Sequence, residues 1–321
     1  MEGIVGLHVD DFFLKGKESF HREVTDEIQK KFTFGKKEEG SFRFTGLDFL
    51  EKEDKMVVTQ NKYRDSLEEI KVEDKMNTER ELSRLEYKAF RGVTGKLSWL
   101  QEQTRPDLAY DSLQMSMKTK NAKVSDVNKI NKIVRKAKEE ECLVKFGRVD
   151  KFENLKIIGF GDAAYKKMDD QTRSVEGRVI FLSNGTRASP LLWKSRKIPQ
   201  VCESTKTAET RAADNLTDDA VYLARMIHEI YTGKKSLKQI PVVLYTDSKP
   251  LVESIYSTRP AERKTIRHVV QSMKDCMSRG EVQEYKWIDT KQMLADILTK
   301  DSVKSDDLHK VLKTGTLPRM Y

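Results

Sequence analysis

The sequence contains few cysteines and no long hydrophobic run, and each scarcity excludes a class of protein. Its cysteines, Cys142, Cys202 and Cys276, are far apart and odd in number, which argues against a disulfide framework and against a zinc site. The chain has no run of about 18 apolar residues, so we expect neither a membrane-spanning helix nor a membrane partner. MEGIVGLHVDD reaches two aspartates too early for a signal peptide. We therefore expect an intracellular protein, in the cytoplasm or the nucleus.

Charge, in contrast, is abundant. Charged residues make up 35% of the 321-residue chain and apolar residues 37%, a composition typical of a globular protein long enough for two domains. The net charge is +9, and the lysines and arginines are spread along the chain among acids. This balance suits a nucleic-acid partner. A merely soluble basic protein would have the same balance, so charge alone does not decide between the two.

The first half of the chain divides into a strand-rich part and a helical part. GIVGLHV and FFLKG predict two strands around an acidic turn, a helix is expected over 18–32, and two further strand-like runs flank the turn EKEDK. NKYRDSLEEI predicts a short helix. The polar residues 71–82 form a linker to three helices, of which the second starts at Pro106 and the third is capped by Ser125. We therefore place a first unit at 1–72 and a helical unit at 73–145.

The second half predicts a mixed sheet that is covered by helices. Strand patterns occur at LKIIGFGD, SVEGRVIFLSNG, PLLWKS, PVVLYTDS and VQEYKWI. Helices are expected near 206–231, 248–257 and 264–279, with a closing helix at KQMLADILTK. Hairpin strands followed by strands that alternate with helices indicate an α+β or α/β domain with a mixed five-stranded sheet and flanking helices. We place this domain at 146–303 and a C-terminal tail at 304–321.

Four acids of this domain lie in apolar surroundings. Asp162 and Asp247 each follow an apolar strand, and the carboxyl ends of neighbouring strands form the site crevice of open α/β sheets. Glu209 begins the apolar stripe of the 206–231 helix, and Asp296 is embedded in LADIL. Each acid alone has an ordinary explanation as a loop acid, a helix cap or a first-turn residue favoured by the helix dipole.

Together, the four acids predict a metal centre. Carboxylates that converge on one edge of a sheet cannot all stay ionised unless cations neutralise them. Hard oxygen ligands select Mg²⁺ or Mn²⁺, and two such ions bridged by carboxylates form a phosphodiester-cleaving site. We therefore predict catalytic and metal-binding roles for Asp162, Glu209, Asp247 and Asp296.

A second acidic feature lies near the start of the chain, where Asp10 and Asp11 are adjacent within GLHVDDFFL. Adjacent carboxylates repel each other and are disfavoured in apolar surroundings. Such a pair usually holds a divalent cation between its members. Its further ligands would have to come from elsewhere in the protein.

Several motifs resemble the C-terminal part of the Pol polyprotein of copia-type LTR retrotransposons. LYTDSK, STKTAETRAA and QMLADILTK resemble motifs that carry the catalytic acids of ribonuclease H, and WKSRKIPQV points to the copia-type branch. LHVDDFFL resembles the catalytic turn of reverse transcriptase. FRFTGLDFLEKEDKMVVTQNKYRDSLEEI resembles the segment from palm to thumb, and YKAFRGVTGKLSWLQEQTRPDLAY the thumb helices. The resemblance covers nearly the whole chain, and TRPDLAY, GKLSWL, TDSK and LADILTK make it specific when taken jointly.

This resemblance implies an identity and a chemistry for each unit. Residues 1–72 would be a partial reverse transcriptase palm without fingers or the first catalytic Asp, 73–145 a thumb or connection, and 146–303 a ribonuclease H-like domain. The four acids would hold two Mg²⁺ or Mn²⁺ ions and hydrolyse the RNA strand of RNA–DNA hybrids. Asp10 and Asp11 would be the remnant of a polymerase site, so polymerase activity is not expected from this chain alone.

Other residues receive secondary roles. His268 is a candidate accessory residue, because the family often places a histidine near the metals, although a surface histidine explains it more simply. His8 and Ala164 depart from the family pattern, in which an aromatic residue precedes the Asp pair and a second, non-ligating acid follows Asp162. Basic residues of WKSRK and RKTIRH are candidates for phosphate contacts or, equally, solvated charge clusters: Lys194, Arg196, Lys197, Arg263, Lys264 and Arg267.

Two alternative functions stay open. The chain could be a catalytically silent remnant that binds nucleic acid or protein, or a subunit of a split reverse transcriptase that other Pol-derived chains complete. Retention of all four acids argues against full decay. We favour a fragment of a longer coding sequence over a palm that another chain completes.

Overall fold

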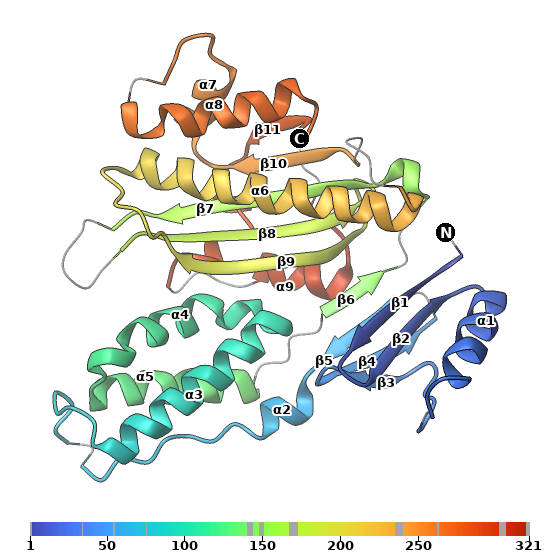
Figure 1. The fold of residues 1–321 in the computed structure, drawn as a ribbon. Coiled ribbons are helices and arrows are strands. Elements are labelled where there is room, and N and C mark those ends of the chain that lie inside the picture. The colour runs from blue at the N-terminus through green and yellow to red at the C-terminus, as the bar shows by residue number, and fades with distance from the viewer. Residues whose placement is uncertain are drawn as a thin grey trace.

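The computed structural model describes residues 2–33, 35–53, 55–74, 76–139, 144–147, 151–166, 173–234, 240–261, 263–301 and 306–318. Cys142 lies outside these ranges, whereas Cys202 and Cys276 are buried free thiols. The described part contains a strand-rich N-terminal unit, a helical unit and a larger C-terminal domain (Figure 1). No helix among these residues is both long and apolar enough to cross a membrane.

The N-terminal unit combines a hairpin with a small sheet. Strands β1 (Gly3–His8) and β2 (Asp11–Gly16) form an antiparallel hairpin that is followed by α1 (Glu18–Gln29). The sheet has the order β3-β4-β5-β6. Phe13 of the hairpin packs its ring against Phe42, Phe44 and Phe49 of this sheet, which fastens the two parts together. The sheet strands are β3 (Phe42–Phe44), β4 (Leu47–Lys52), β5 (Lys55–Thr59) and β6 (Val144–Gly147).

Strand β6 changes the domain organisation that was expected from the sequence. It follows the helical unit in the chain, yet it pairs antiparallel with β5, and Val58 lies opposite Val144. The N-terminal sheet is therefore completed by a strand at the far end of the 73–145 segment. The two units are interleaved in sequence and do not simply succeed each other.

The helical unit is built around an apolar core. Its fully buried side chains include Phe90 and Leu97 of one helix and Leu108 and Ile130 of two others, and they belong to one core cluster. Ser125 was predicted to cap the third helix. In the structure, the carboxylate of Asp126 instead accepts a hydrogen bond from the backbone N–H of Lys123 at the start of that helix, 3.1 Å away. The elements are α2 (Asn61–Asp65), α3 (Arg84–Gln103), η1 (Pro106–Leu108), α4 (Ala109–Lys118), η2 (Thr119–Asn121) and α5 (Val124–Glu139).

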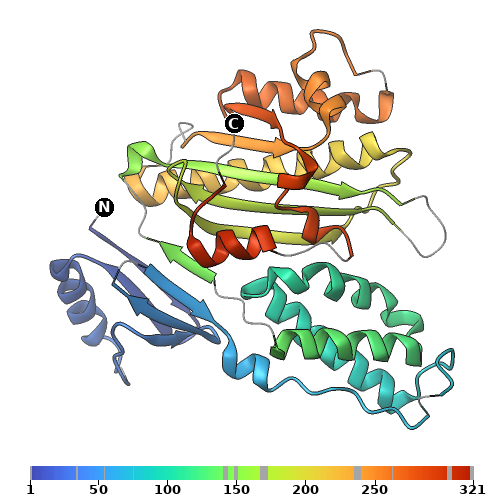
Figure 2. The ribbon, with the colours of Figure 1, turned by 180° about the vertical axis from the view of Figure 1, so that it is seen from behind.

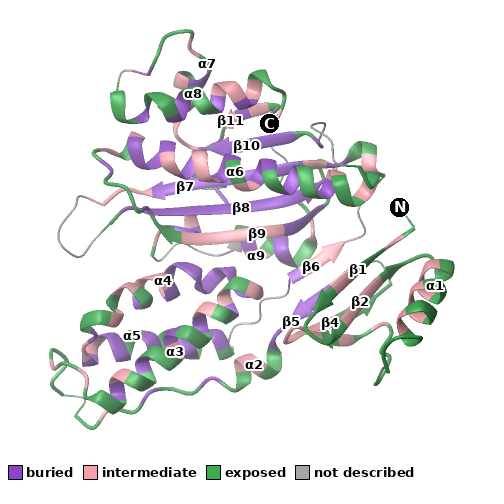
Figure 3. Cartoon of the chain, viewed as in Figure 1, coloured by how far each residue is buried: buried purple, intermediate pink, exposed green. Residues whose placement is uncertain are grey.

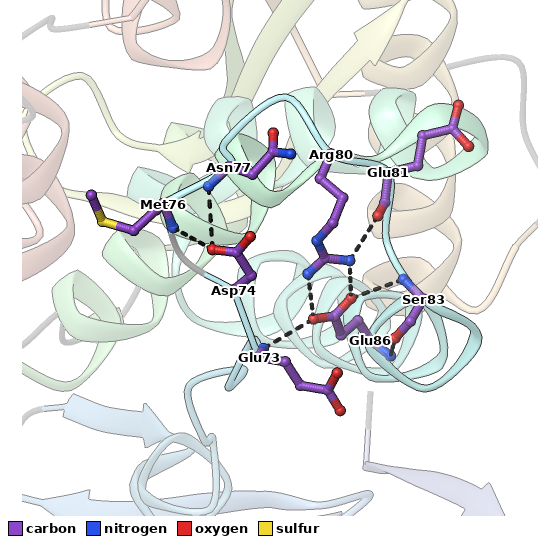
Figure 4. Close-up of polar contacts among 8 residues, drawn as sticks. All are labelled: Glu73, Asp74, Met76, Asn77, Arg80, Glu81, Ser83 and Glu86. Atoms are coloured by element: carbon purple, nitrogen blue, oxygen red, sulfur yellow. Dashed lines mark hydrogen bonds and ion pairs between the residues drawn. The ribbon is translucent and has the colours of Figure 1, made fainter.

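The polar linker is attached to the start of α3 by a network around Glu86 (Figure 4). Ser83 and Glu86 form a capping box. The guanidinium of Arg80 donates to both carboxylate oxygens of Glu86, at 2.8 and 2.9 Å. This hydrogen bonding is the main reason why the pKa of Glu86 falls to about 2. The network therefore orders a charged segment that has little apolar surface to bury.

The C-terminal domain contains a five-stranded mixed sheet, as the sequence predicted. Its order is β11-β10-β7-β8-β9. The first three strands along the chain run antiparallel, and β10 is parallel to both of its neighbours. Strands β7, β8 and β10 are mostly buried, whereas β9 is mostly of intermediate exposure (Figure 3). The strands of the sheet are β7 (Lys156–Ala164), β8 (Val175–Ser183), β9 (Ala188–Lys197), β10 (Val242–Thr246) and β11 (Glu284–Trp287); η3 (Phe152–Asn154) precedes them.

Helices cover both faces of this sheet. The long helix α6 (Thr205–Thr232) lies along one face, with α7 (Lys249–Tyr256) and α8 (Lys264–Ser278) beside it (Figure 1). Its Leu216, Ala220 and Ala224 are buried in the core between them. The other face is covered by the last elements of the chain (Figure 2).

The prediction of a closing helix at KQMLADILTK is wrong. The segment instead forms two short 3-10 turns, η4 (Thr290–Gln292) and η5 (Asp296–Leu298), with an irregular stretch between them. Met293, Leu294 and Ala295 are consecutive and all buried, which one stripe of a helix cannot achieve. Gly177 of the sheet lets this segment pack closely, because a Cβ at that position would lie only 2.7 Å from Cβ of Leu298.

The expected C-terminal tail contains a packed helix. Helix α9 (Asp306–Thr314) buries Leu308, Val311 and Leu312 in the second core of the C-terminal domain. The described part of residues 304–321 is thus integral to that domain.

The motif TRPDLAY forms a junction between the helical unit and the C-terminal domain. The buried pair Arg105–Asp107 has 2.7 Å between Nη2 and Oδ2. Arg105 also donates to the carbonyl oxygen of Ala137 at the end of α5, at 2.6 Å. From the other side, Nε2 of His309 in α9 lies 3.6 Å from Oδ1 of Asp107. The conspicuous motif is therefore explained by packing between units.

Candidate active site

Three of the predicted acids meet at the carboxyl edge of the sheet. Asp162 lies in β7, Asp247 directly follows β10, and Glu209 is near the start of α6. One carboxylate oxygen from each residue lies within 4.8 Å of the others. Within the described residues, these three form the only such group of three or more potential metal ligands. Residues that are distant in sequence are therefore brought into one acidic cluster.

The glycines of IIGFGD explain how α6 comes close enough to add Glu209. Gly159 and Gly161 face the helix, and a Cβ at these positions would lie 3.0 and 3.1 Å from side-chain atoms of Leu216. Larger residues would push α6 away from β7. The glycines thus set the distance at which Glu209 meets Asp162.

Burial and mutual repulsion raise the pKa values of these acids when no cation is bound. Burial, together with the charges of Asp162 and Asp247, raises the pKa of Glu209 to about 9. Burial is also the main reason why the pKa of Asp162 rises to about 6. Oε2 of Glu209 is buried and has no hydrogen-bond partner. A buried carboxylate oxygen without a donor, on a residue of an acidic cluster, fits a metal ligand.

Two neighbouring side chains orient Asp247. The hydroxyl of Thr290 donates to Oδ2 of Asp247 at 2.7 Å. The indole N–H of Trp287 donates to the backbone carbonyl of Asp247 at 3.1 Å. One oxygen of the Asp247 carboxylate is therefore anchored, which leaves the other available to a ligand.

Asp296 lies at the border of the cluster. Its Oδ1 is 2.8 Å from Nζ of Lys300, and burial raises its pKa. Lys300 also reaches Asp162, with 3.5 Å between Nζ and Oδ2. Thr299 donates a hydrogen bond from its hydroxyl to the same Oδ2. Asp296 thus lies beside the group of three and outside it, and Lys300 joins it to Asp162.

Sequence reasoning missed Thr290, Thr299 and Lys300. The last two stand inside LADILTK, but a search for acids does not register the polar groups that neutralise them. The spacing of four residues between Asp296 and Lys300 offered a signal, because oppositely charged residues so spaced often pair. The Thr290 contact had no sequence signal, since it joins segments that only the sheet brings together.

The secondary candidates lie in varied surroundings. His268 is exposed on α8 and lies near Asp214 of α6, which is not one of the four acids. Lys194 pairs with Asp219, 3.1 Å away. Arg263 reaches Glu203 at 3.7 Å. The remaining basic candidates are exposed on β9 and α8: Arg196, Lys197, Lys264 and Arg267.

Asp10 and Asp11 lie at an exposed hairpin turn. The turn residues are Val9 and Asp10, since His8 pairs with Asp11, and Val9 adopts a positive φ of 54°. Among the described residues, no third acid or other ligand forms a metal-binding group with this pair. The two aspartates therefore lack the convergent ligands that surround Asp162.

Comparisons with known proteins agree with the resemblance to retrotransposon Pol polyproteins. The chain is 24% identical over 219 residues to the retrovirus-related Pol polyprotein from transposon RE2 of Arabidopsis thaliana; the match covers 66% of this chain and 14% of that protein. A second Arabidopsis polyprotein, from transposon RE1, is 23% identical over 215 residues, with the same coverage. No family model matches the chain. The chain thus resembles the C-terminal part of a retrotransposon Pol polyprotein, and its match spans only about 14% of these relatives.

Solved structures establish the fold. A foamy viral protease-reverse transcriptase in complex with double-stranded DNA matches 89% of this chain and 46% of its own, with a TM-score of 0.52 and 12% identity. The N-terminal ribonuclease H domain of rv2228c from Mycobacterium tuberculosis matches 49% of this chain and 96% of its own, with a TM-score of 0.35 and 17% identity. The mixed five-stranded sheet with its flanking helices gives the C-terminal domain a ribonuclease H-like fold.

Proposed function

We propose that the C-terminal domain hydrolyses the RNA strand of RNA–DNA hybrids, with Asp162, Glu209, Asp247 and Asp296 as its acidic residues and two Mg²⁺ or Mn²⁺ ions as cofactors. The observation that carries this proposal is the meeting of three carboxylates from separate elements within 4.8 Å. Hard carboxylate oxygens in such a cluster favour small divalent cations over softer metals.

The residues present fit a divalent ion. Oε2 of Glu209 is buried without a donor, and a bound cation would supply the missing partner. The pKa of Glu209, about 9 because of burial and the neighbouring acids, means that the carboxyl holds a proton at neutral pH until a cation replaces it. Such ions supply Lewis acidity that activates water and stabilises the leaving oxygen.

The protein's own groups would keep this site in shape. Thr290 holds one oxygen of Asp247, and Thr299 and Lys300 hold Oδ2 of Asp162. These contacts restrict the carboxylates before any substrate arrives, as preorganised catalysis requires. The buried sheet beneath them leaves little room for the acids to move apart.

The net charge of +9 and the Pol relatives support a nucleic-acid substrate. Proteins that act on RNA-containing duplexes without reading sequence recognise their shape, phosphates and 2′-hydroxyl groups. Arg196 and Lys197 are exposed at the end of β9 and are the basic candidates that we propose for phosphate contacts. We expect single-stranded RNA and double-stranded DNA to remain uncut.

The deciding experiment is cleavage of a labelled RNA–DNA hybrid with Mg²⁺ or Mn²⁺ by the wild type and by Asp247→Asn. The substitution removes one charge and a candidate ligand at nearly unchanged volume, so the fold should survive while the rate falls by orders of magnitude. Ala164→Asp is the matched control next to the same cluster and should change the rate little. A folded Asp247→Asn that cuts as fast as the wild type would contradict the site, and a folded but inactive wild type would favour the catalytically silent alternative.

A further inference from the structure

Lys300 places a positive charge inside the acidic cluster. Its Nζ lies 2.8 Å from Oδ1 of Asp296 and 3.5 Å from Oδ2 of Asp162. The Lys300 side chain is 36% exposed, whereas that of Asp162 is only 1% exposed. One ammonium group therefore bridges two acids, one of them deeply buried, at the edge where the metal ligands meet.

The backbone holds the lysine in this position. The N–H groups of Thr299 and Lys300 both donate to the carbonyl oxygen of Asp296, at 3.1 and 3.0 Å. Ile297 and Leu298, which lie between Asp296 and Thr299, are buried. The turn is thus anchored in the core, which fixes the backbone of Lys300 one turn after Asp296.

The electrostatic situation of Lys300 resembles that of a bound ion. Carboxylates crowded in a low-dielectric edge need a counter-charge, and within the cluster Lys300 supplies one. An unperturbed lysine ammonium is charged at neutral pH, and Lys300 places this charge between Asp162 and Asp296.

We propose that Lys300 is a positioning residue that acts as the internal counter-ion of the metal-free site and competes with the divalent cation for Asp162. This inference rests on the metal-binding part of the proposed function. Lys300 keeps Asp162 and Asp296 ordered while no metal is bound. A cation held by Asp162 would lie close to the positive charge of Lys300, so Lys300 would also weaken metal binding.

Two measurements on the full chain test the role of Lys300. The first is titration of Mn²⁺ alone, by calorimetry at pH 8, into the wild type, Lys300→Met and Lys300→Arg. Removal of a unit charge close to a divalent ion should tighten Mn²⁺ binding about tenfold even under water-like screening, whereas Lys300→Arg should stay close to the wild type. Lys310→Met, which removes an exposed lysine of α9, is the matched control and should change nothing.

The second measurement is thermal unfolding in EDTA at pH 8. Lys300→Met should melt several degrees below the wild type, because breaking the pair leaves a buried charge uncompensated. Added Mn²⁺ should narrow the difference. Lys300→Gln, a milder change that retains hydrogen bonding, should move both quantities in the same direction if Lys300→Met folds poorly.

The inference is overturned if neither neutral variant binds Mn²⁺ more tightly than the wild type, or if neither is less stable in EDTA. Failure of the proposed function would look different. A wild type that binds Mn²⁺ but cuts no hybrid would refute the nuclease activity and leave the result on Lys300 standing.

Discussion

Arg105 and Asp107 form an ion pair whose side chains are only 3% and 0% exposed, with 2.7 Å between Nη2 and Oδ2. Nε of Arg105 also donates to the second carboxylate oxygen at 2.8 Å, so the pair is bidentate. Burial alone would raise the pKa of Asp107, but the hydrogen bonds from Arg105 and the nearby His309 hold this pKa below its usual range. The pair belongs to the junction between the helical unit and the C-terminal domain.

We expect Arg105→Met to destabilise the protein by about 3–5 kcal/mol, because it leaves a buried carboxylate without its partner. The measurement is the free energy of unfolding from urea denaturation. Glu18→Gln, which removes the acid of an exposed pair with Arg22, is the control and should have no measurable effect. A loss no larger than that of the control would mean that the junction does not depend on the pair.

The metal-free protein should lose stability as the pH rises. The pKa of Glu209 is about 9 in the folded state because of burial and the neighbouring acids, against an ordinary value of 4.5. Between these values the folded state holds a proton that the unfolded state has released, so stability falls as the pH rises through this window.

Glu209→Gln should flatten this dependence. In EDTA at pH 8 we expect the variant to be more stable than the wild type by at least about 1 kcal/mol, since a tenfold change in a proton-binding equilibrium corresponds to about 1.4 kcal/mol. The advantage should shrink towards pH 5. Urea denaturation at several pH values is the measurement, with Glu229→Gln on the exposed side of the same helix as control. Parallel pH profiles for wild type and Glu209→Gln would contradict the argument.

Thr290→Val should slow hybrid cleavage about tenfold, because residues that orient a metal ligand typically contribute factors of about 10–100. The substitution removes the 2.7 Å hydrogen bond to Asp247 at almost constant volume. Because the contact concerns the reacting centre, kcat should fall while KM changes little. Thr290→Ser restores a hydroxyl and should recover most of the rate, an outcome that a purely structural role for the methyl group would not give.

Binding to RNA–DNA hybrids should weaken steeply between about 50 and 200 mM salt, because phosphate contacts release counterions. Measuring in the Asp247→Asn background prevents cleavage. Arg196→Gln should reduce the salt slope, whereas Lys194→Gln should not, since Lys194 is engaged by Asp219. An affinity that stays flat with salt would remove the electrostatic support for a nucleic-acid substrate.

The pure chain should extend no primer on a template with Mg²⁺ or Mn²⁺. Asp10 and Asp11 are exposed at a hairpin turn, and in the part of the chain that the structure describes no third ligand groups with them. A polymerase centre with only two adjacent acids cannot hold both ions of a two-metal reaction. Template-dependent extension by the isolated protein would refute this expectation.

The sequence supported the placement of the acids because their neighbours are regular. Asp162 and Asp247 come at the ends of unbroken apolar runs, which predict buried strands with neighbouring carboxyl ends. Glu209 stands at the start of an apolar stripe that must face the sheet. These apolar runs and the helical periodicity therefore predicted that the three residues lie at one edge.

Other features could not be predicted from the sequence, because tertiary packing determines them. The segment 293–298 buries nearly every residue, so its hydrophobicity indicated burial but its period could not indicate irregular backbone. Strand β6 is only four residues long and finds its partner beyond the whole helical unit. Lys300 and Thr290 act across elements, and no local pattern encodes such contacts.

The pairing of β5 with β6 has a consequence for how the protein is made. Val58 meets Val144, so the N-terminal sheet cannot be completed until the chain has closed a loop that contains every helix from α2 to α5. Contacts this distant in sequence slow folding, because the entropy of loop closure must be lost before the strands gain their hydrogen bonds. During synthesis, β5 therefore has one unpaired edge until the whole helical unit has been made. The sheet is completed only when β6 follows and pairs with that edge.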